Sequence, residues 1–135
     1  MNNDGQLDIV LGNKRGENEV FLLDKDGKPG ESIHFSGITS HTLDVTLADL
    51  NKDGNLDILV ANYGSPNELL VNKGDMVFDH QFISNRNFET TAIFAFDINR
   101  DQIIDVVETN FEHLNLYYIG HLGDDRNVEN ANSDD

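Results

Sequence analysis

Three observations predict an all-β fold built from repeated antiparallel sheets. A nine-residue acidic loop at 49–57 recurs at 97–105 and, from its second position onward, at 1–8. The copies lie 49 and then 48 residues apart, and a fixed period of this size is typical of solenoids, propellers and arrays. Between the loops, short apolar runs alternate with clusters of Gly and Asn, and no segment keeps a helical period. The repeat unit is therefore a small set of strands.

The repeat extends beyond the acidic loop. Residues 2–13 and 51–62 are identical at seven of twelve aligned positions. Farther along, the segment 18–22 aligns with 67–71 and with 115–119. Each unit therefore carries the same later strand as well as the same loop.

The middle unit predicts four strands, near 42–48, 56–62, 67–72 and 76–83. In the first of these, apolar Leu and Val alternate with Asp and Thr, which is the period of a strand with one buried face. The second is a short apolar run, and the turns between strands are rich in Gly, Asn and Pro. Four antiparallel strands in about 48 residues match one blade of a β-propeller.

The blades that this fold predicts are incomplete. We expect a partial blade at 1–40 that lacks its first strand, a complete blade at 41–88 and a partial blade at 89–123. The last of these has no convincing final strand, since the chain becomes polar from Gly120. Residues 124–135 are almost wholly Asp, Asn, Glu and small residues, and we expect them to form an acidic disordered tail. We then expect sheet edges to be exposed, or to be covered by another chain or by further sequence.

Aromatic residues are expected in the core of these sheets. The strand at 90–96 is apolar on both faces, which predicts deep burial. The expected core aromatics are Phe78, Phe94, Phe96, Tyr117 and Tyr118.

Composition excludes several partners. The chain has 25 Asp and Glu against 9 Lys and Arg, a formal net charge of −16, so we expect it to repel nucleic acids and anionic lipids. No apolar run approaches the ~18 residues of a membrane span. The absence of Cys excludes disulfides and thiolate metal sites. Because the N-terminal residues given are polar, we expect no signal peptide in this sequence.

The spacing of the acidic loop is typical of a site for a hard cation. Oxygen ligands at loop positions 1, 3, 5 and 9, with a main-chain carbonyl at position 7, suit Ca²⁺ better than Mg²⁺, and Gly at position 6 allows the tight turn. No Cys or His lies in any loop, which disfavours soft metals. The expected Ca²⁺ ligands of the complete loop, which we call loop 2, are Asp49, Asn51, Asp53, Asn55 and Asp57.

The other two copies are weaker sites. Loop 3, at 97–105, has Gln102 in place of Gly, and a non-Gly residue in a left-handed conformation costs ~1–2 kcal/mol. Its expected ligands are Asp97, Asn99, Asp101, Ile103 and Asp105. Loop 1, at 1–8, has no residue at the first ligand position, and its expected ligands are Asn2, Asp4, Gln6 and Asp8.

Two other calcium-binding folds share this opening pattern. An EF-hand needs a bidentate Glu at position 12 and flanking helices, and a dockerin-type module needs an acidic ligand there and a following helix. Position 12 of loop 2 is Val60, and both flanks resemble strands. Both alternatives are therefore disfavoured.

The sequence resembles the FG-GAP or VCBS-type repeat. The resemblance rests on Asp-x-Asn-x-Asp-Gly-x-x-Asp-Ile-Leu-Val-Ala-Asn at 49–62, on Asn-Glu-Leu-Leu-Val-Asn-Lys-Gly at 67–74 and on Phe78. It implies an integrin-α-like β-propeller in which Ca²⁺ locks the hairpin between the first two strands of a blade. It also implies an extracellular or cell-surface location, and a protein or carbohydrate ligand bound on a propeller face built by loops.

No signature of an enzyme is found. The chain has no Gly-x-Ser-x-Gly elbow, phosphate-binding Gly loop or His-Glu-x-x-His motif, and its five His residues are scattered. We therefore expect a calcium-stabilised, non-catalytic binding or adhesion module, with Tyr63 the aromatic residue most suited to contact a ligand. The alternatives are an accessory propeller segment of a secreted degradative enzyme and a stand-alone repeat protein that closes its ring as a homo-oligomer through open sheet edges.

Overall fold

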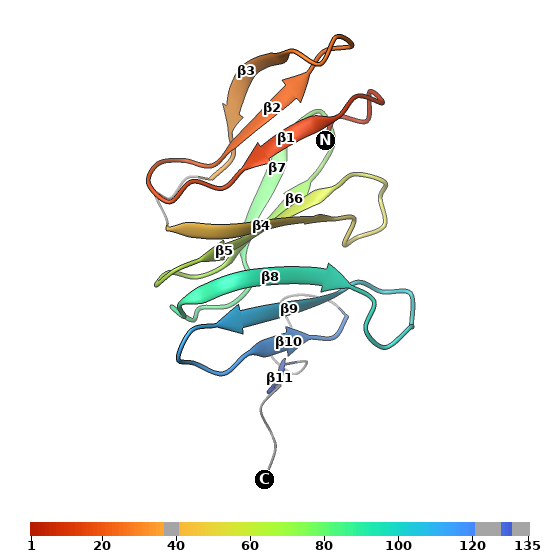
Figure 1. Cartoon of the computed structure of the whole chain (residues 1–135). Helices are drawn as coiled ribbons and strands as arrows, with labels where there is room; N and C mark the ends of the chain where they lie inside the picture. Colours follow the sequence, from red (N-terminus) through yellow and green to blue (C-terminus); the bar gives the residue numbers. More distant parts are fainter. Residues whose placement is uncertain (37–40, 121–127, 131–135) are drawn as a thin grey trace.

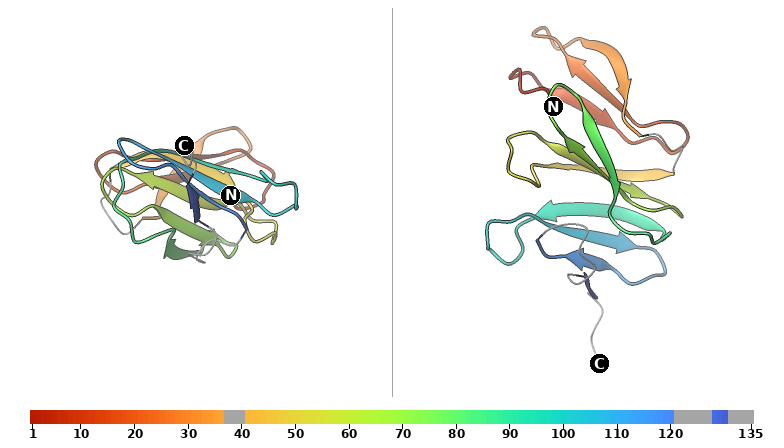
Figure 2. Two further views of the ribbon diagram at one scale, coloured as in Figure 1. Left: turned by 90° about the horizontal axis from the view of Figure 1, so that it is seen from below. Right: turned by 180° about the vertical axis from the view of Figure 1, so that it is seen from behind.

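The chain folds into three antiparallel sheets stacked face to face (Figure 1; from below and behind in Figure 2). The computed structural model describes residues 1–36, 41–120 and 128–130, and this part of the chain contains strands and no helix. No segment described here could cross a membrane as a helix. The predicted all-β class and the incomplete antiparallel blades are confirmed.

Each sheet follows the order of the sequence. The first consists of β1 (Asp8–Leu11), β2 (Glu19–Leu23) and β3 (Pro29–His34). The second consists of β4 (Thr42–Ala48), β5 (Asp57–Asn62), β6 (Glu68–Asn72) and β7 (Phe78–Phe82). The third consists of β8 (Thr90–Phe96), β9 (Asp105–Asn110), β10 (Leu116–Tyr118) and β11 (Val128–Asn130). The strands of the middle sheet begin and end within two residues of the predicted ranges.

The end of the third sheet differs from the expectation. The polar sequence after Gly120 predicts no further strand, yet β11 pairs with β10 in antiparallel register. Ladder hydrogen bonds join main-chain groups and need no apolar side chain, so composition does not reveal such a strand. The other residues of the predicted tail, 124–127 and 131–135, lie outside the described residues.

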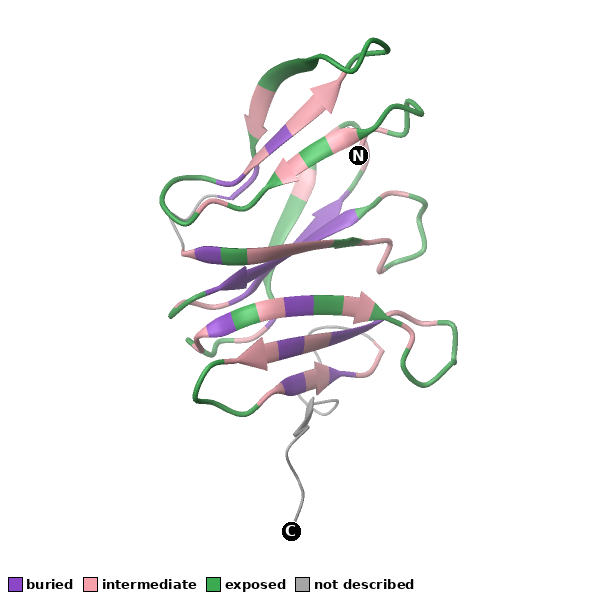
Figure 3. Cartoon of the chain, viewed as in Figure 1, coloured by how far each residue is buried: buried purple, intermediate pink, exposed green. Residues whose placement is uncertain are grey.

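The core lies on both faces of the middle sheet (Figure 3). Side chains alternate along β5, so that Leu59 and Ala61 face the third sheet while Ile58 and Val60 face the first. All residues of β5 and β6 are buried. Burial on both sides explains why β5 reads in the sequence as a continuous apolar run rather than an alternating one.

The outward-facing residues of β8 correct one expectation. Phe94 and Phe96 are predicted to be core residues, but they are 48% and 50% exposed. Ile93, whose side chain lies on the face of β8 toward the middle sheet, is fully buried. The strand is apolar on both faces, but in the described chain only one face is covered by a sheet. Leu43 and Leu47 of β4 are also exposed, at 42% and 39%.

A polar relay joins each sheet to the next. Asn67, at the start of the second sheet's third strand, donates from Nδ2 to Thr90 Oγ1 at 2.9 Å, and Thr90 donates to Asn110 Oδ1 at 2.7 Å. The same relay runs from Asn18 through Thr42 to Asn62, between the first sheet and the second. Side-chain amides and hydroxyls thus repeat as connectors at fixed positions of the unit.

The innermost strands of the second and third sheets are joined directly. Thr46 of β4 donates to the carbonyl of Ile93 at 2.7 Å, and Asp44 accepts the Ile93 N–H at 3.0 Å. This pair of bonds holds β4 beside β8, and β4 and β8 each lead into an acidic loop. The spacing between loops 2 and 3 is therefore set by the sheets.

Candidate metal centre

The three acidic loops lie along the same side of the stack (right in Figure 1). Loop 1 precedes β1, loop 2 joins β4 to β5, and loop 3 joins β8 to β9. Each loop therefore leads into the second strand of the repeat unit. The predicted ligands of each loop lie together in that loop. The three loops are therefore three separate candidate sites.

The main chain has the same unusual conformation in all three loops. Position 4 is left-handed, with φ of 60° at Asn3, 60° at Lys52 and 64° at Arg100. Position 6 is also left-handed, with φ of 70° at Gln102 and larger values at the two glycines. The predicted strain at Gln102 is therefore present in the backbone.

The side chains of loop 2 fold inward onto main-chain N–H groups. Asp49 accepts the N–H of Asp53 at 3.1 Å and that of Gly54 at 2.9 Å, one on each carboxylate oxygen. Asn51 Oδ1 accepts the Asp53 N–H at 2.9 Å, and Asp53 accepts the Asn55 N–H at 2.8 Å. These bonds gather the oxygens of positions 1, 3 and 5 around one turn of the chain.

Loop 3 repeats this pattern with Gln102 in the place of Gly54. Asp97 accepts the N–H groups of Asp101 and Gln102 at 3.1 and 2.8 Å. Asn99 Oδ1 accepts the Asp101 N–H at 2.9 Å, and Asp101 accepts the Ile103 N–H at 2.8 Å. In loop 1, the Asp4 N–H donates to Asn2 Oδ1 and the Gln6 N–H donates to Asp4 Oδ1. The carboxylate of the first position is not present in this loop.

The aspartate at position 9 anchors each complete loop to its sheet. Asp57 and Asp105 are fully buried. Asp57 accepts the N–H of Leu50 at 3.0 Å and that of Asn72 at 2.8 Å, one on each oxygen. Asp105 does the same with Ile98 and Gly120. Asp8 accepts the Leu23 N–H at 3.3 Å and pairs with the N-terminal ammonium group.

Burial and charge shift the carboxyl groups of loop 2 in opposite directions. Burial is the largest influence on Asp57 and raises its pKa, and the negative charges of Asp53 and Asp49 raise it further, although the N–H bonds from Asn72 and Leu50 oppose the shift. The pKa of Asp53 is lowered, chiefly by the N–H of Asn55. A cation in the loop would favour the ionised form of both groups.

The donor set fits a calcium ion by its chemistry. A carboxylate has about four lone-pair sites on its two oxygens, so the N–H bonds described leave sites for a cation. In the described residues no three acidic or His side chains converge as a metal site by themselves. A cation in loop 2 therefore needs the neutral oxygens of Asn51 and of the Asn55 carbonyl beside the charges of Asp49 and Asp53. Such mixed oxygen sets are typical of Ca²⁺.

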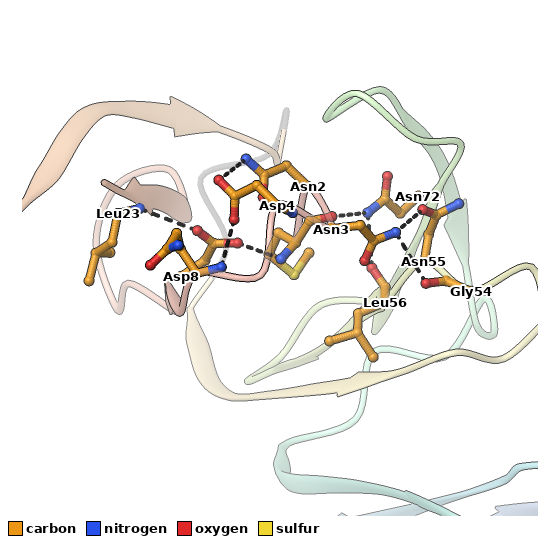
Figure 4. A network of polar contacts seen from close by, with 11 residues as sticks. Asn2, Asn3, Asp4, Asp8, Leu23, Gly54, Asn55, Leu56 and Asn72 are labelled. Carbon is orange, nitrogen blue, oxygen red and sulfur yellow. Dashed lines mark hydrogen bonds and ion pairs between the residues drawn. The ribbon is translucent and has the colours of Figure 1, made fainter. Parts of the chain in front are cut away.

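Hydrogen bonds tie loop 1 to loop 2 across the boundary between the first two sheets (Figure 4). Asn3 Nδ2 donates to Asn55 Oδ1 at 2.9 Å and to the Gly54 carbonyl at 3.3 Å. Asn72 Nδ2 donates to the carbonyls of Met1 at 3.1 Å and Leu56 at 3.2 Å. The loop pattern does not predict these contacts, because Asn3 occupies a position that supplies no ligand.

Loops 2 and 3 are separated by a cavity of about 430 Å³. One side is lined by Leu50, Asn51 and Lys52 of loop 2, and the other by Ile103 and Ile104 at the end of loop 3. Loops 2 and 3, which both keep a first-position Asp, therefore lie on either side of this cavity. In the part of the chain that the structure describes, no hydrogen bonds like those between loops 1 and 2 join them.

Comparison with known proteins agrees with the repeat. The sequence model of the FG-GAP-like repeat matches residues 1–60 and again 49–108. Cartilage acidic protein 1 of Xenopus tropicalis is 27% identical over 121 residues, which cover 82% of this chain and 18% of that protein. Cartilage acidic protein 1 of Mus musculus is 28% identical over 116 residues, which cover 78% of this chain and again 18% of the relative. The chain thus matches less than a fifth of the length of these relatives.

Proposed function

Because this chain belongs to the FG-GAP-like repeat family, we propose that it is a calcium-stabilised β-propeller segment that serves as a non-catalytic binding module, with its complete blade at 41–88. The observation that carries the proposal is the loop itself, which recurs with the same main-chain conformation and the same inward hydrogen bonds at the same edge of successive sheets. The ion's role would be structural, since each loop joins the first two strands of a sheet.

The face opposite the acidic loops is the proposed ligand-binding face. Its four-residue tips, at 14–17, 63–66 and 111–114, differ in sequence from one repeat to the next. Each tip lies between two Asn residues. The main-chain N–H of the first donates to the side-chain oxygen of the second at 2.7–2.8 Å. A constant frame that presents variable tips suits recognition of a protein or carbohydrate partner.

Tyr63 is the residue proposed to contact that partner. Its ring is exposed at the tip of the second sheet, and its centroid lies 6.0 Å from that of the His41 ring. A hydrogen bond to Glu89 raises the pKa of the Tyr63 hydroxyl. An exposed aromatic ring beside a carboxylate offers both stacking and hydrogen bonding.

An extracellular or cell-surface location follows from the same proposal. The relatives matched are named for cartilage and for their acidity, and this chain shares the acidity with its net charge of −16. Millimolar-range calcium sites are typical of extracellular modules.

The proposal is tested by thermal unfolding with Ca²⁺ and with a chelator. An ion that binds only the folded state stabilises it by RT ln(1 + [Ca²⁺]/Kd), about 2.7 kcal/mol at a hundredfold excess over Kd. We expect chelation to lower Tm by several degrees. Asp53→Ala should abolish most of this calcium-dependent shift, and Asp101→Ala should reduce it less, because loop 3 is strained. An identical Tm with and without chelator would overturn the calcium part of the proposal.

Closure of the ring by a homo-oligomer is the second candidate architecture. It is favoured by apolar side chains on the two outer faces of the stack, namely Ile9 and Leu11 on the first sheet and Phe94 and Phe96 on the third. The mass of the chain in solution tests this alternative.

A further inference from the structure

Hydrogen bonds from loop 1 and from the end of β6 converge on the segment of loop 2 that holds the expected carbonyl ligand (Figure 4). Asn3 holds the Gly54 carbonyl and the Asn55 side chain. Asn72 holds the Leu56 carbonyl. The carbonyl of Asn55, at position 7, lies between the two held carbonyls in sequence. Its direction is therefore fixed from both sides.

The two donors come from different sheets. Asn3 belongs to loop 1, which leads into the first sheet, and is exposed. Asn72 ends β6 of the second sheet and is fully buried, and its Nδ2 also reaches the Met1 carbonyl in loop 1. The second donor thus joins loop 1 to loop 2 at a point shielded from solvent.

Among the described residues, loop 3 has no equivalent support. In the repeat, the position of Asn3 is taken by Lys52 and that of Asn72 by Gly120. Lys52 lines the cavity that separates loops 2 and 3, and Gly120 has no side-chain amide. The carbonyl of Ile103, the position-7 residue of loop 3, therefore lacks both holding groups.

We propose that Asn3 and Asn72 are positioning residues for the cation site of loop 2, and that loop 1 serves as a brace for its neighbour. The inference rests on the proposed calcium function. A carbonyl that is already aimed loses less conformational entropy when the ion binds, so the braced loop binds more tightly than an unbraced one. Loop 2 is then the stronger site for two reasons, its glycine at position 6 and its brace.

The test compares Asn3→Ala with Lys52→Ala, the same repeat position facing the cavity. Calorimetric titration of the full chain with Ca²⁺ should show the tighter site weakened about two- to tenfold by Asn3→Ala, the range expected for the loss of its bond to the Gly54 carbonyl, the one Asn3 bond that holds the main chain. Lys52→Ala removes a positive charge and should weaken neither site. Asn3 is exposed, so its replacement should leave the fold intact, whereas Asn72→Ala removes a buried group.

A second measurement needs no metal. With chelator present, hydrogen exchange of the amides at 54–57 should be faster in Asn3→Ala than in the parent chain, while the buried β5 amides at 58–61 should be unchanged and report that the sheet is folded. Lys52→Ala should leave exchange at 102–105 unchanged.

The outcomes separate the two proposals. A parent chain that binds no Ca²⁺ would overturn the proposed calcium function, and the positioning role with it. A parent chain that binds Ca²⁺, with an Asn3→Ala variant of unchanged affinity, would overturn the positioning role alone. Faster exchange at 54–57 with unchanged affinity would also overturn the positioning role, because the bonds would then serve only to join the sheets.

Discussion

At the scale of single residues, the repeat makes departures from its own pattern visible. Gln102 adopts φ of 70° where the other loops have Gly5 and Gly54. A side chain in this conformation is strained, and the surrounding hydrogen bonds, including its own N–H to Asp97 at 2.8 Å, hold it there. The strain is present in the folded chain without a cation, so it lowers the population of the loop conformation to which a cation would bind.

Reciprocal substitutions at position 6 test this strain. Gln102→Gly should raise the free energy of unfolding by about 1 kcal/mol, because relief of strain is partly offset by the greater freedom of Gly in the unfolded chain. Gly54→Gln should lower it by about 1–2 kcal/mol. Both are measured by denaturant unfolding in the presence of chelator. Equal and opposite effects are not required, but a destabilised Gln102→Gly variant would contradict the argument.

A second departure is the buried carboxyl group of Glu108 in β9. In the middle sheet, buried Glu68 on β6 pairs across the strands with Val60 on β5, whereas in the third sheet Glu108 on β9 pairs with Leu116 on β10. The acidic residue has thus changed strands. Glu108 Oε2 accepts the Tyr118 hydroxyl at 3.2 Å, and Oε1 has no hydrogen-bond partner in the described chain. Burial raises the pKa of Glu108.

This shift predicts a pH dependence of stability. A raised pKa means that the folded state holds the proton more tightly than the unfolded state, whose carboxyl group has the ordinary pKa of 4.5. The free energy of unfolding therefore falls as pH rises from about 4.5, the pKa of the unfolded chain, through the higher pKa of the folded state. Glu108→Gln should be more stable than the parent by about 1 kcal/mol at pH 7, and the difference should shrink below pH 4.5. Urea unfolding of both chains across this range is the measurement, and a pH-independent difference would contradict the assignment to Glu108.

At the scale of elements, the sequence was a good guide to where strands lie and a poor one to what covers them. Strand limits in the middle sheet followed from apolar runs between turn residues. The exposure of Phe94 did not follow, because an apolar residue has the same identity whether or not another sheet covers it. The hydrogen bonds from Asn3 to loop 2 were not predicted either, because the position of Asn3 in the loop pattern supplies no ligand.

The relay that joins the sheets gives an element-scale prediction. Asn67 accepts the Asn62 N–H at 2.8 Å and also donates across to Thr90 of the next sheet. Its counterpart Asn115 accepts the Asn110 N–H at 2.8 Å. In the described chain, Asn115 has no relay threonine beside it. Asn67→Ala should therefore lower the free energy of unfolding by about 2–3 kcal/mol and Asn115→Ala by about 1 kcal/mol.

The comparison between these two variants is internally controlled. Both replace an Asn at the same position of the repeat, and both release one tip of the proposed ligand-binding face. Their difference therefore reports the bonds that Asn67 makes to the third sheet. Denaturant midpoints at constant m-value give the two changes. Equal losses would show that the relay contributes nothing beyond the turn.

At the scale of the whole molecule, the two ends of the stack expose positions that are buried in its middle. Ile9 and Leu11 of the first sheet are each 42% exposed, and their repeat equivalents Ile58 and Val60 are fully buried against that sheet. The outer face of the third sheet carries Phe94 and Phe96. At both ends of the described chain, the outer sheet thus exposes apolar side chains like those that are buried on the middle sheet.

These end faces predict self-association in which the third sheet of one copy packs on the first sheet of another. Such a heterologous contact closes into a ring or continues as an open filament. The net charge of −16 opposes it at low ionic strength, so association should increase with both protein concentration and salt. Sedimentation equilibrium in Ca²⁺ should show a mass above the 15.1 kDa of one chain, and the double variant Phe94→Ser, Phe96→Ser should return it toward that value. A parent chain that remains a strict monomer at high concentration and high salt would count against ring closure by oligomerisation, since apolar faces of this kind associate more strongly when their charge is screened.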